Sequence, residues 1–214
     1  MRLLFAIALV SGSVAFAQPP KEGELPKEVP PRFGIQYKVK TYPQDSAKKA
    51  LNSTIEAIEK GETPYVVAHL LDPGFVELRV ADRAKQYEAP VEIELSRLRD
   101  AQIRNPENYD RDSRLPTDRV KFRALIIERS RERAFRQIVQ DMEAKLLDDP
   151  HALKELRKLL RDGMPTDTET GAKLTHMDVK DRALYFRKIE DRWFLENRHE
   201  DIPAPVVPPK KEGM

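Results

Sequence analysis

Three polar side chains in the first half of the chain are of types that can move protons. Tyr65 and His69 are four residues apart, which places them on one face of a helix, and Asp72 follows at the expected end of that helix. A carboxylate in an apolar cavity has a raised pKa and can act as a general base. A structural role explains the same residues, with His69 part-buried beside Leu70 and Asp72 ending its helix. We take the structural role as the main interpretation and catalysis as the alternative.

A second candidate site is a ligand pocket lined by four aromatic side chains near the C-terminus, together with Tyr65 and His69. The four are Tyr185, Phe186, Trp193 and Phe194. Two runs of residues that favour strands, 183–189 and 192–198, are separated only by Glu190-Asp191, which predicts a β-hairpin. The expected register pairs Lys188 with Trp193, Phe186 with Leu195, and Arg187 with Phe194. Large apolar groups, among them Tyr185, then lie on both sides of the sheet. One side can pack against helices, and the other can line an apolar pocket. Packing of Trp193 in the core is the main interpretation, and a place in the pocket wall is the alternative.

The sequence offers no motif for a metal or a cofactor. It has no cysteine, and His69, His151, His176 and His199 are too widely spaced for a ligand pair on one helix or hairpin. His176 and Asp178 can share one face of a strand, but a solvated strand explains them equally. The eight glycines are scattered and form no phosphate-binding loop. We therefore expect neither metal nor cofactor.

The N-terminus has the pattern of a secretory signal peptide. Arg2 precedes a short apolar run, and Ala15-Phe16-Ala17 supplies a site for cleavage near Ala17. The run is too short to span a bilayer. We expect residues 1–17 to be removed and the mature chain to be secreted or periplasmic. Without cysteine it can have neither a disulfide nor the lipid anchor of a bacterial lipoprotein.

The charge balance argues against nucleic acid as a partner. The chain has 38 basic and 36 acidic residues, and removal of residues 1–17 takes away only Arg2, which leaves 37 and 36. A net charge of +1 is too small for an electrostatic footprint on nucleic acid or an anionic membrane.

Helix signals dominate the region between two proline-rich ends. We expect a proline-rich linker over 18–43, in which 33–42 can add a strand, and a proline-rich tail over 202–214. Capping residues and apolar spacing predict helices over 46–61, 63–71, 117–148 and 150–163. Residues 91–95 alternate like a strand but also suit a helix. We expect 105–115 to be a loop or a mobile insertion.

Three segments resemble the nuclear transport factor two-like superfamily, in particular its secreted bacterial members. Ser46–Phe75 resembles the first helix pair, Lys145–Gly163 a helical segment, and Asp178–Asn197, with its "RWFLEN" ending, the closing hairpin. The resemblance covers about 45–199 and leaves 83–131 unmatched. It implies an α+β domain over 44–201, a cone of N-terminal helices on a curved antiparallel sheet with an extra helical insertion. A homodimer follows by analogy with the fold.

The fold does not imply one activity, since the superfamily includes enzymes, binding modules and adaptors. No residue set here matches a catalytic pattern of the family. We therefore expect an exported, non-enzymatic domain that binds a small apolar molecule or a protein partner. One alternative is a cofactor-free isomerase, cyclase or hydratase that uses Tyr65, His69 or Asp72. Another is an envelope-associated adaptor tethered by its proline-rich ends.

Overall fold

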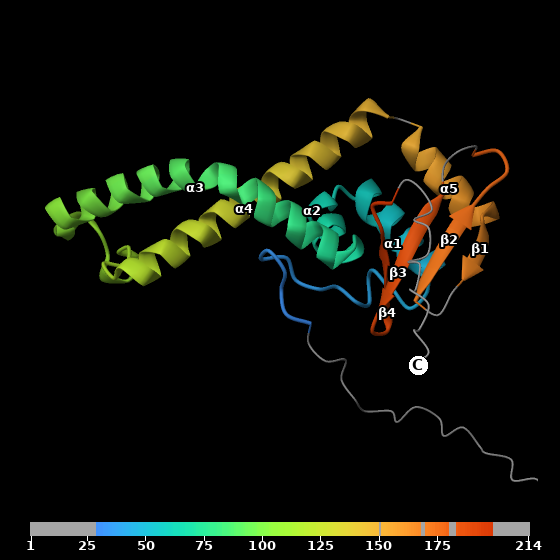
Figure 1. Ribbon diagram of the computed structural model, residues 1–214, viewed down its shortest axis with the longest axis horizontal. Helices are drawn as coiled ribbons and strands as arrows, with labels where there is room; N and C mark the ends of the chain where they lie inside the picture. The colour runs from blue at the N-terminus through green and yellow to red at the C-terminus, as the bar shows by residue number, and fades with distance from the viewer. Residues whose placement is uncertain (1–28, 150, 168–169, 180–182, 199–214) are drawn as a thin grey trace, which may run out of the picture.

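A small α+β body and a long helical hairpin make up the structure (Figure 1). The computed structural model describes residues 29–149, 151–167, 170–179 and 183–198. The expected mixture of helix and antiparallel sheet is confirmed. The expected signal peptide, the linker up to residue 28 and the tail from 202 lie outside the described residues.

The body begins with two helical segments that end where the sequence indicates. Helix α1 spans Ala47–Glu59, and Ser46 caps it by accepting a hydrogen bond from the amide of Lys49. Gly61, at φ +70°, follows its end in the left-handed conformation that glycine adopts easily. Helix α2 (Thr63–Tyr65) continues into a π-helical turn, η1 (Val66–Leu70).

Four antiparallel strands form an open sheet in the order β1-β2-β3-β4. The strands are β1 (Met164–Asp167), β2 (Gly171–Thr175), β3 (Leu184–Ile189) and β4 (Arg192–Leu195). The expected hairpin is confirmed, and its register is the expected one: Lys188 pairs with Trp193, Phe186 with Leu195 and Arg187 with Phe194. The turn has two residues, and Glu190 takes a positive φ of 54° in it.

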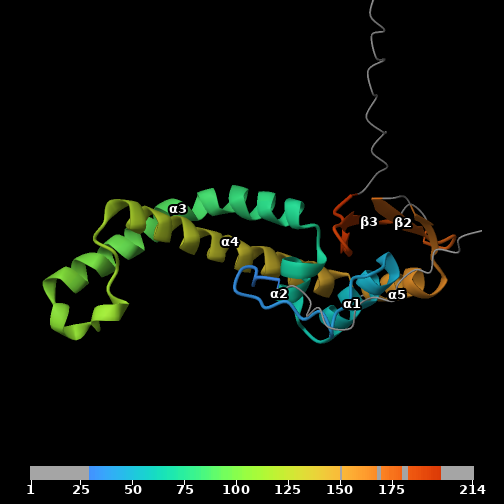
Figure 2. The same ribbon diagram turned by 90° about the horizontal axis from the view of Figure 1, so that it is seen from below.

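The core of the body lies between the sheet and two helices, α1 and α5 (Ala152–Asp162) (Figure 2). Leu51 and Leu174 are fully buried there, and Phe186 is 2% exposed. Trp193 packs against this cluster, so its core interpretation holds. Because β-strand side chains alternate between faces, the same strands leave a second face of the sheet outside this core.

The hairpin consists of α3 (Pro73–Arg104) and α4 (Arg119–Asp148), which cross each other in Figure 1. At 1.5 Å per residue, α3 is about 48 Å long. Its inward side chains recur in steps of four, four and three, an 11-residue repeat: Val76, Val80, Ala84, Tyr87, Val91 and Leu95. Along α4 they recur in steps of four: Phe122, Ile126, Ser130, Ala134, Ile138 and Met142. The strand alternative over 91–95 is wrong, because Ile93 lies on the outer face of α3, 53% exposed.

The tip of the hairpin is built around one buried amide. Two short 3₁₀ turns, η2 (Pro106–Asn108) and η3 (Arg111–Ser113), connect the helices. The Gln102 side chain, 6% exposed, accepts a hydrogen bond from the Leu115 amide at 2.8 Å and donates one to the Ser113 carbonyl at 3.3 Å. The region expected to be a loop or mobile insertion is thus an ordered connection that Gln102 holds.

Residues 29–43, the described part of the expected linker, pack on the body. Tyr42 is fully buried and contacts the Tyr65 ring, with centroids 4.7 Å apart. The alternation over 33–42 forms no strand. The segment has a two-residue turn between Arg32 and Ile35 and a second turn in which the amides of Thr41 and Tyr42 donate to the Lys38 carbonyl. Among the described helices, none is long and apolar enough to cross a membrane.

Candidate binding groove

Tyr65 is a core residue. It is 2% exposed, and its hydroxyl accepts a hydrogen bond from the Lys38 amide at 3.2 Å. Burial raises the pKa of Tyr65 from the usual value near 10 to about 12, so the phenol stays protonated well into the alkaline range. The predicted helical pairing with His69 exists, since the two rings lie 5.0 Å apart. Neither ring lines any of the pockets described below.

His69 holds the N-terminal segment in place. Its ring is 3% exposed, and Nε2 lies 2.8 Å from the carbonyl oxygen of Ile35. Because a carbonyl can only accept, Nε2 carries the proton. Burial lowers the pKa of His69, and the nearby Arg32 and Arg192 cations act in the same direction, although the bond to Ile35 opposes them. His69 is therefore neutral at physiological pH and acts as a structural donor.

Asp72 is the N-cap of α3. Its Oδ1 accepts a hydrogen bond from the Gly74 amide at 2.8 Å, and its own amide donates to the Leu195 carbonyl at 2.9 Å. The other carboxylate oxygen lies 3.6 Å from the Arg187 guanidinium. Asp72 thus joins α3 to the edge of β4. Its role is structural, but it begins α3, whereas the sequence interpretation had it end the preceding helix.

The four predicted pocket aromatics separate onto the two faces of the sheet. Phe186 and Trp193 belong to the core face, and Tyr185 and Phe194 lie on the other. Tyr185 and Phe186 line a cavity of about 720 Å³, but basic side chains line it as well, so it is not the apolar pocket we expected.

An apolar groove lies elsewhere, between α4 and the turn at residues 32–35. The amide of each end residue of this turn donates to the carbonyl of the other, at 3.0 and 2.9 Å. Its two central residues, Phe33 and Gly34, have φ values of 52° and 78°, as a type I′ turn requires. Glycine adopts this conformation readily, but a bulky side chain there costs of order 1–3 kcal/mol and persists only where neighbouring contacts impose it.

Four contacts impose that conformation. The Arg32 guanidinium donates to the carbonyls of Ala68 and Pro73, each at 2.8 Å, and His69 donates to Ile35. The Phe33 ring stacks on Phe135 of α4, with centroids 4.5 Å apart and planes 13° apart. The turn is therefore fixed from below by Arg32 and His69 and from above by α4.

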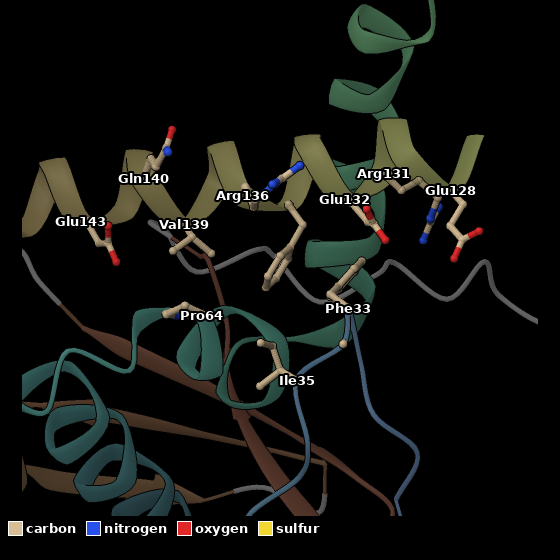
Figure 3. Close-up of a pocket in the computed structure, with 12 residues that line it drawn as sticks. Phe33, Ile35, Pro64, Glu128, Arg131, Glu132, Arg136, Val139, Gln140 and Glu143 are labelled. Atoms are coloured by element: carbon tan, nitrogen blue, oxygen red, sulfur yellow. The ribbon is translucent and has the colours of Figure 1, made fainter. Parts of the chain in front are cut away.

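The groove has an apolar floor and a charged rim (Figure 3). Its volume is about 640 Å³, within the range of ligand sites. The floor is formed by Phe33, Ile35, Pro64, Phe135 and Val139. Arg131 on the rim pairs with Glu77, and Glu132 pairs with Arg129. Glu128, Arg136 and Glu143 form no ion pair within the described part of the chain.

A second depression of about 410 Å³ continues the groove toward the tip of the hairpin. It lies between α3 and α4, over Leu95, Leu98 and Leu125, and shares Glu132 and Arg136 with the first. From Leu125 to Glu143 the combined surface follows α4 for about 27 Å.

Sequence reasoning missed this site. The sequence signal was Phe33-Gly34, an X-Gly pair between alternating apolar residues, which is typical of a tight hairpin turn. The position of α4 over the turn had no signal, because it depends on the path of the whole hairpin.

The comparisons add no family to this geometry. No protein-family model, curated protein or solved structure matches the chain. Functional conclusions therefore rest on the residues of the groove and on the rest of the described structure.

Proposed function

We propose that the protein is a non-enzymatic binding protein and that its groove on α4 binds an amphipathic helix of a protein partner. The observation that carries this proposal is the Phe33 turn. An aromatic residue is held in a costly backbone conformation against Phe135, at the edge of an apolar surface. Such local strain clusters at ligand clamps and binding sites.

The shape of the groove favours a helical occupant. Its walls are α4, α3 and a closed turn, and the backbone groups of these helices are already paired within them. An extended peptide would find no strand edge there to pair with its own backbone, whereas a helix satisfies its backbone internally. The run of about 27 Å along α4 suits a helix of about 18 residues.

The rim favours a basic partner. Within the part of the chain that the structure describes, two carboxylates on the rim, Glu128 and Glu143, have no ion-pair partner, against one such guanidinium, Arg136. Complementary charge mainly sets the rate and specificity of association, and the apolar floor supplies most of the affinity.

The proposals on fold family and on cellular compartment rest on sequence patterns. We propose that the body is a nuclear transport factor two-like domain, and that most of the α3–α4 hairpin is the unmatched insertion over 83–131. The order of elements supports this, with α1 and α2 first and the antiparallel sheet last.

The signal-peptide pattern supports export with cleavage near Ala17, and the mass of the secreted chain tests it. The catalytic alternative has no observation in its favour, because Tyr65, His69 and Asp72 have structural partners.

The test uses two model peptides of matched design, one with leucine on one helical face and lysine on the other, and one with glutamate in place of lysine. We expect the Leu/Lys peptide to bind the mature chain at least about ten-fold more tightly than the Leu/Glu peptide, by fluorescence anisotropy.

A charge placed in the groove separates specific binding from adhesion. Ile35→Glu should weaken the binding of the Leu/Lys peptide at least about ten-fold. Val39→Glu is the matched control, because Val39 lies on the same segment, is 39% exposed and does not line the groove. Equal affinity of the two peptides, or equal effects of the two variants, would contradict the proposal.

A further inference from the structure

A cavity of about 320 Å³ lies where the first part of α3, the last part of α4 and the end of β4 meet. We call it the junction cavity. It shares no lining residue with the groove on α4, and it lies on a different face of that helix. Its volume is at the lower end of the range for small-molecule sites. The junction cavity is therefore a separate site that suits a small ligand.

Most of the wall of the junction cavity is apolar. Six apolar side chains line it: Val67, Leu71, Phe75, Ile138, Met142 and Leu195. All except Val67 are only partly buried, although they pack against the core clusters of the body and the hairpin. An apolar ligand would cover surface that these side chains leave open, and such burial is favourable in proportion to its area.

Two cations stand beside this apolar wall. Arg79 from α3 and Lys145 from α4 both line the cavity. Arg79 follows Phe75 by four residues and Lys145 follows Met142 by three, so each cation lies one turn from an apolar wall residue on the same face of its helix. Within the part of the chain that the structure describes, neither cation has an ion-pair partner.

Asp141, one of two carboxylates on the wall, already has its partners. Its two oxygens accept hydrogen bonds from Gln137, at 2.9 Å, and from Arg83. These bonds lower the pKa of Asp141, and the charge of Lys145, four residues further on, lowers it a little more without a hydrogen bond. The Lys145 ammonium group is therefore near Asp141 but is still available to a ligand.

The other carboxylate, Glu196, pairs with Arg198 at 3.0 Å. Both acidic side chains of the wall are thus occupied, and Arg79 and Lys145 are the charges that a ligand can meet. A carboxylate suits this pair, because a guanidinium can bind both carboxylate oxygens side by side and an ammonium group adds a compact charge.

We propose that the junction cavity binds a small carboxylic acid with a linear alkyl chain. The alkyl chain covers the open surface of Phe75, Met142 and Leu195, and the carboxylate lies between Arg79 and Lys145.

An NMR titration of the labelled mature chain with octanoate tests this proposal. We expect saturable chemical-shift changes at Leu71, Phe75 and Asn197, which line the cavity. Octanol has the same chain without the charge, and acetate has the charge without the chain. Octanoate should bind at least about ten-fold more tightly than octanol, and acetate should give no saturable change.

A pair of double variants separates the cavity from the overall charge. Arg79→Gln with Lys145→Gln should weaken octanoate binding at least about ten-fold and leave octanol binding unchanged. The control, Arg97→Gln with Lys121→Gln, removes the same charge from exposed positions on the same two helices, outside the cavity. Melting curves would verify that both double variants fold.

Four results would overturn the proposal. They are no saturable binding of octanoate, equal affinity for octanoate and octanol, shift changes in the groove on α4 in place of the junction cavity, and an equal loss of affinity in the two double variants. None of them bears on peptide binding by the groove, which shares no residue with this site.

Discussion

The body and the hairpin bury their apolar side chains in different ways. The body brings together segments distant in sequence, since α1 at residues 47–59 packs on strands that begin more than a hundred residues later. The hairpin pairs two neighbouring helices, and its distal cluster comes from α3, α4 and their connection. The groove lies where the hairpin meets the N-terminal turn of the body, so binding there depends on contact between the two regions.

The largest expected effect on stability comes from a substitution in the core of the body. Phe186, 2% exposed, packs against the cluster of α1 and α5. Phe186→Ala should lower the free energy of unfolding by about 3–5 kcal/mol, because it removes apolar contacts and leaves a cavity. Denaturant titration followed by Trp193 fluorescence measures it. If hydrogen exchange in α4 residues 122–134 accelerates as much as in β3, the two regions unfold as one unit and the comparison fails.

The matched change in the hairpin is Ile126→Ala. Ile126 is 1% exposed and packs with Val91, Leu95 and Phe122. We expect a loss of about 2–5 kcal/mol that is confined to the hairpin. Amides of α3 and α4 near the tip should exchange faster, while those of β3 and β4 keep their rates. Equal acceleration in the sheet would show that the hairpin has no separate stability.

Acid should weaken the link between the N-terminal turn and the body. Burial lowers the pKa of His69 below the usual value near 6.5, so the unfolded chain binds the proton more readily than the folded one. Stability is therefore complete above about pH 6.5 and falls as the pH drops toward the folded-state pKa, at up to about 1.4 kcal/mol per pH unit.

The His69→Gln variant shows how much of the pH dependence of stability comes from the protonation of His69. Glutamine does not titrate, so the difference in stability between wild type and variant should shrink as the pH falls from about 7 to 5. Denaturant titrations at several pH values measure this. A pH-independent difference would show that His69 does not take up the proton.

The smallest effect concerns the two non-glycine residues that have a positive φ among those the structure describes. Phe33 is stacked on Phe135, whereas Glu190 is exposed in its turn. Glu190→Gly should raise stability by about 0.5–1 kcal/mol, because relief of backbone strain exceeds the entropy cost of glycine. Phe33→Gly should give less or turn negative, since the stack is lost. Equal gains in thermal unfolding would show that the Phe33 stack contributes nothing.

Local patterns predicted the body well. The β3–β4 register followed from the two-residue spacing at Glu190-Asp191, and the ends of α1 and α5 followed from Ser46, Gly61 and Gly163. The helix predicted over 117–148 begins beside Asp118, whose side chain caps α4 by accepting a hydrogen bond from the Lys121 amide. Each of these signals lies within a few residues of what it determines.

The helical hairpin was harder to predict from the sequence, because apolar residues on its outer faces produce the alternation of a β-strand. Val91 and Leu95 face α4, but exposed Ile93 between them produces a strand-like alternation, and Pro90 within α3 argues locally against a helix. Val120 and Ile127 are apolar residues of the helix predicted over 117–148, yet they are 77% and 42% exposed. The groove could not be predicted at all, because it joins Phe33 to residues about a hundred positions away.

The most direct test of the central claim is to map the Leu/Lys peptide by NMR on the labelled mature chain. We expect chemical-shift changes at Phe33, Ile35 and Pro64 and along α4 from Leu125 to Glu143, with the signals of Tyr185 and Arg187 unchanged. Shifts confined to the sheet, or a saturable complex that leaves Phe33 and Val139 unperturbed, would contradict the assignment of the α4 groove as the binding surface.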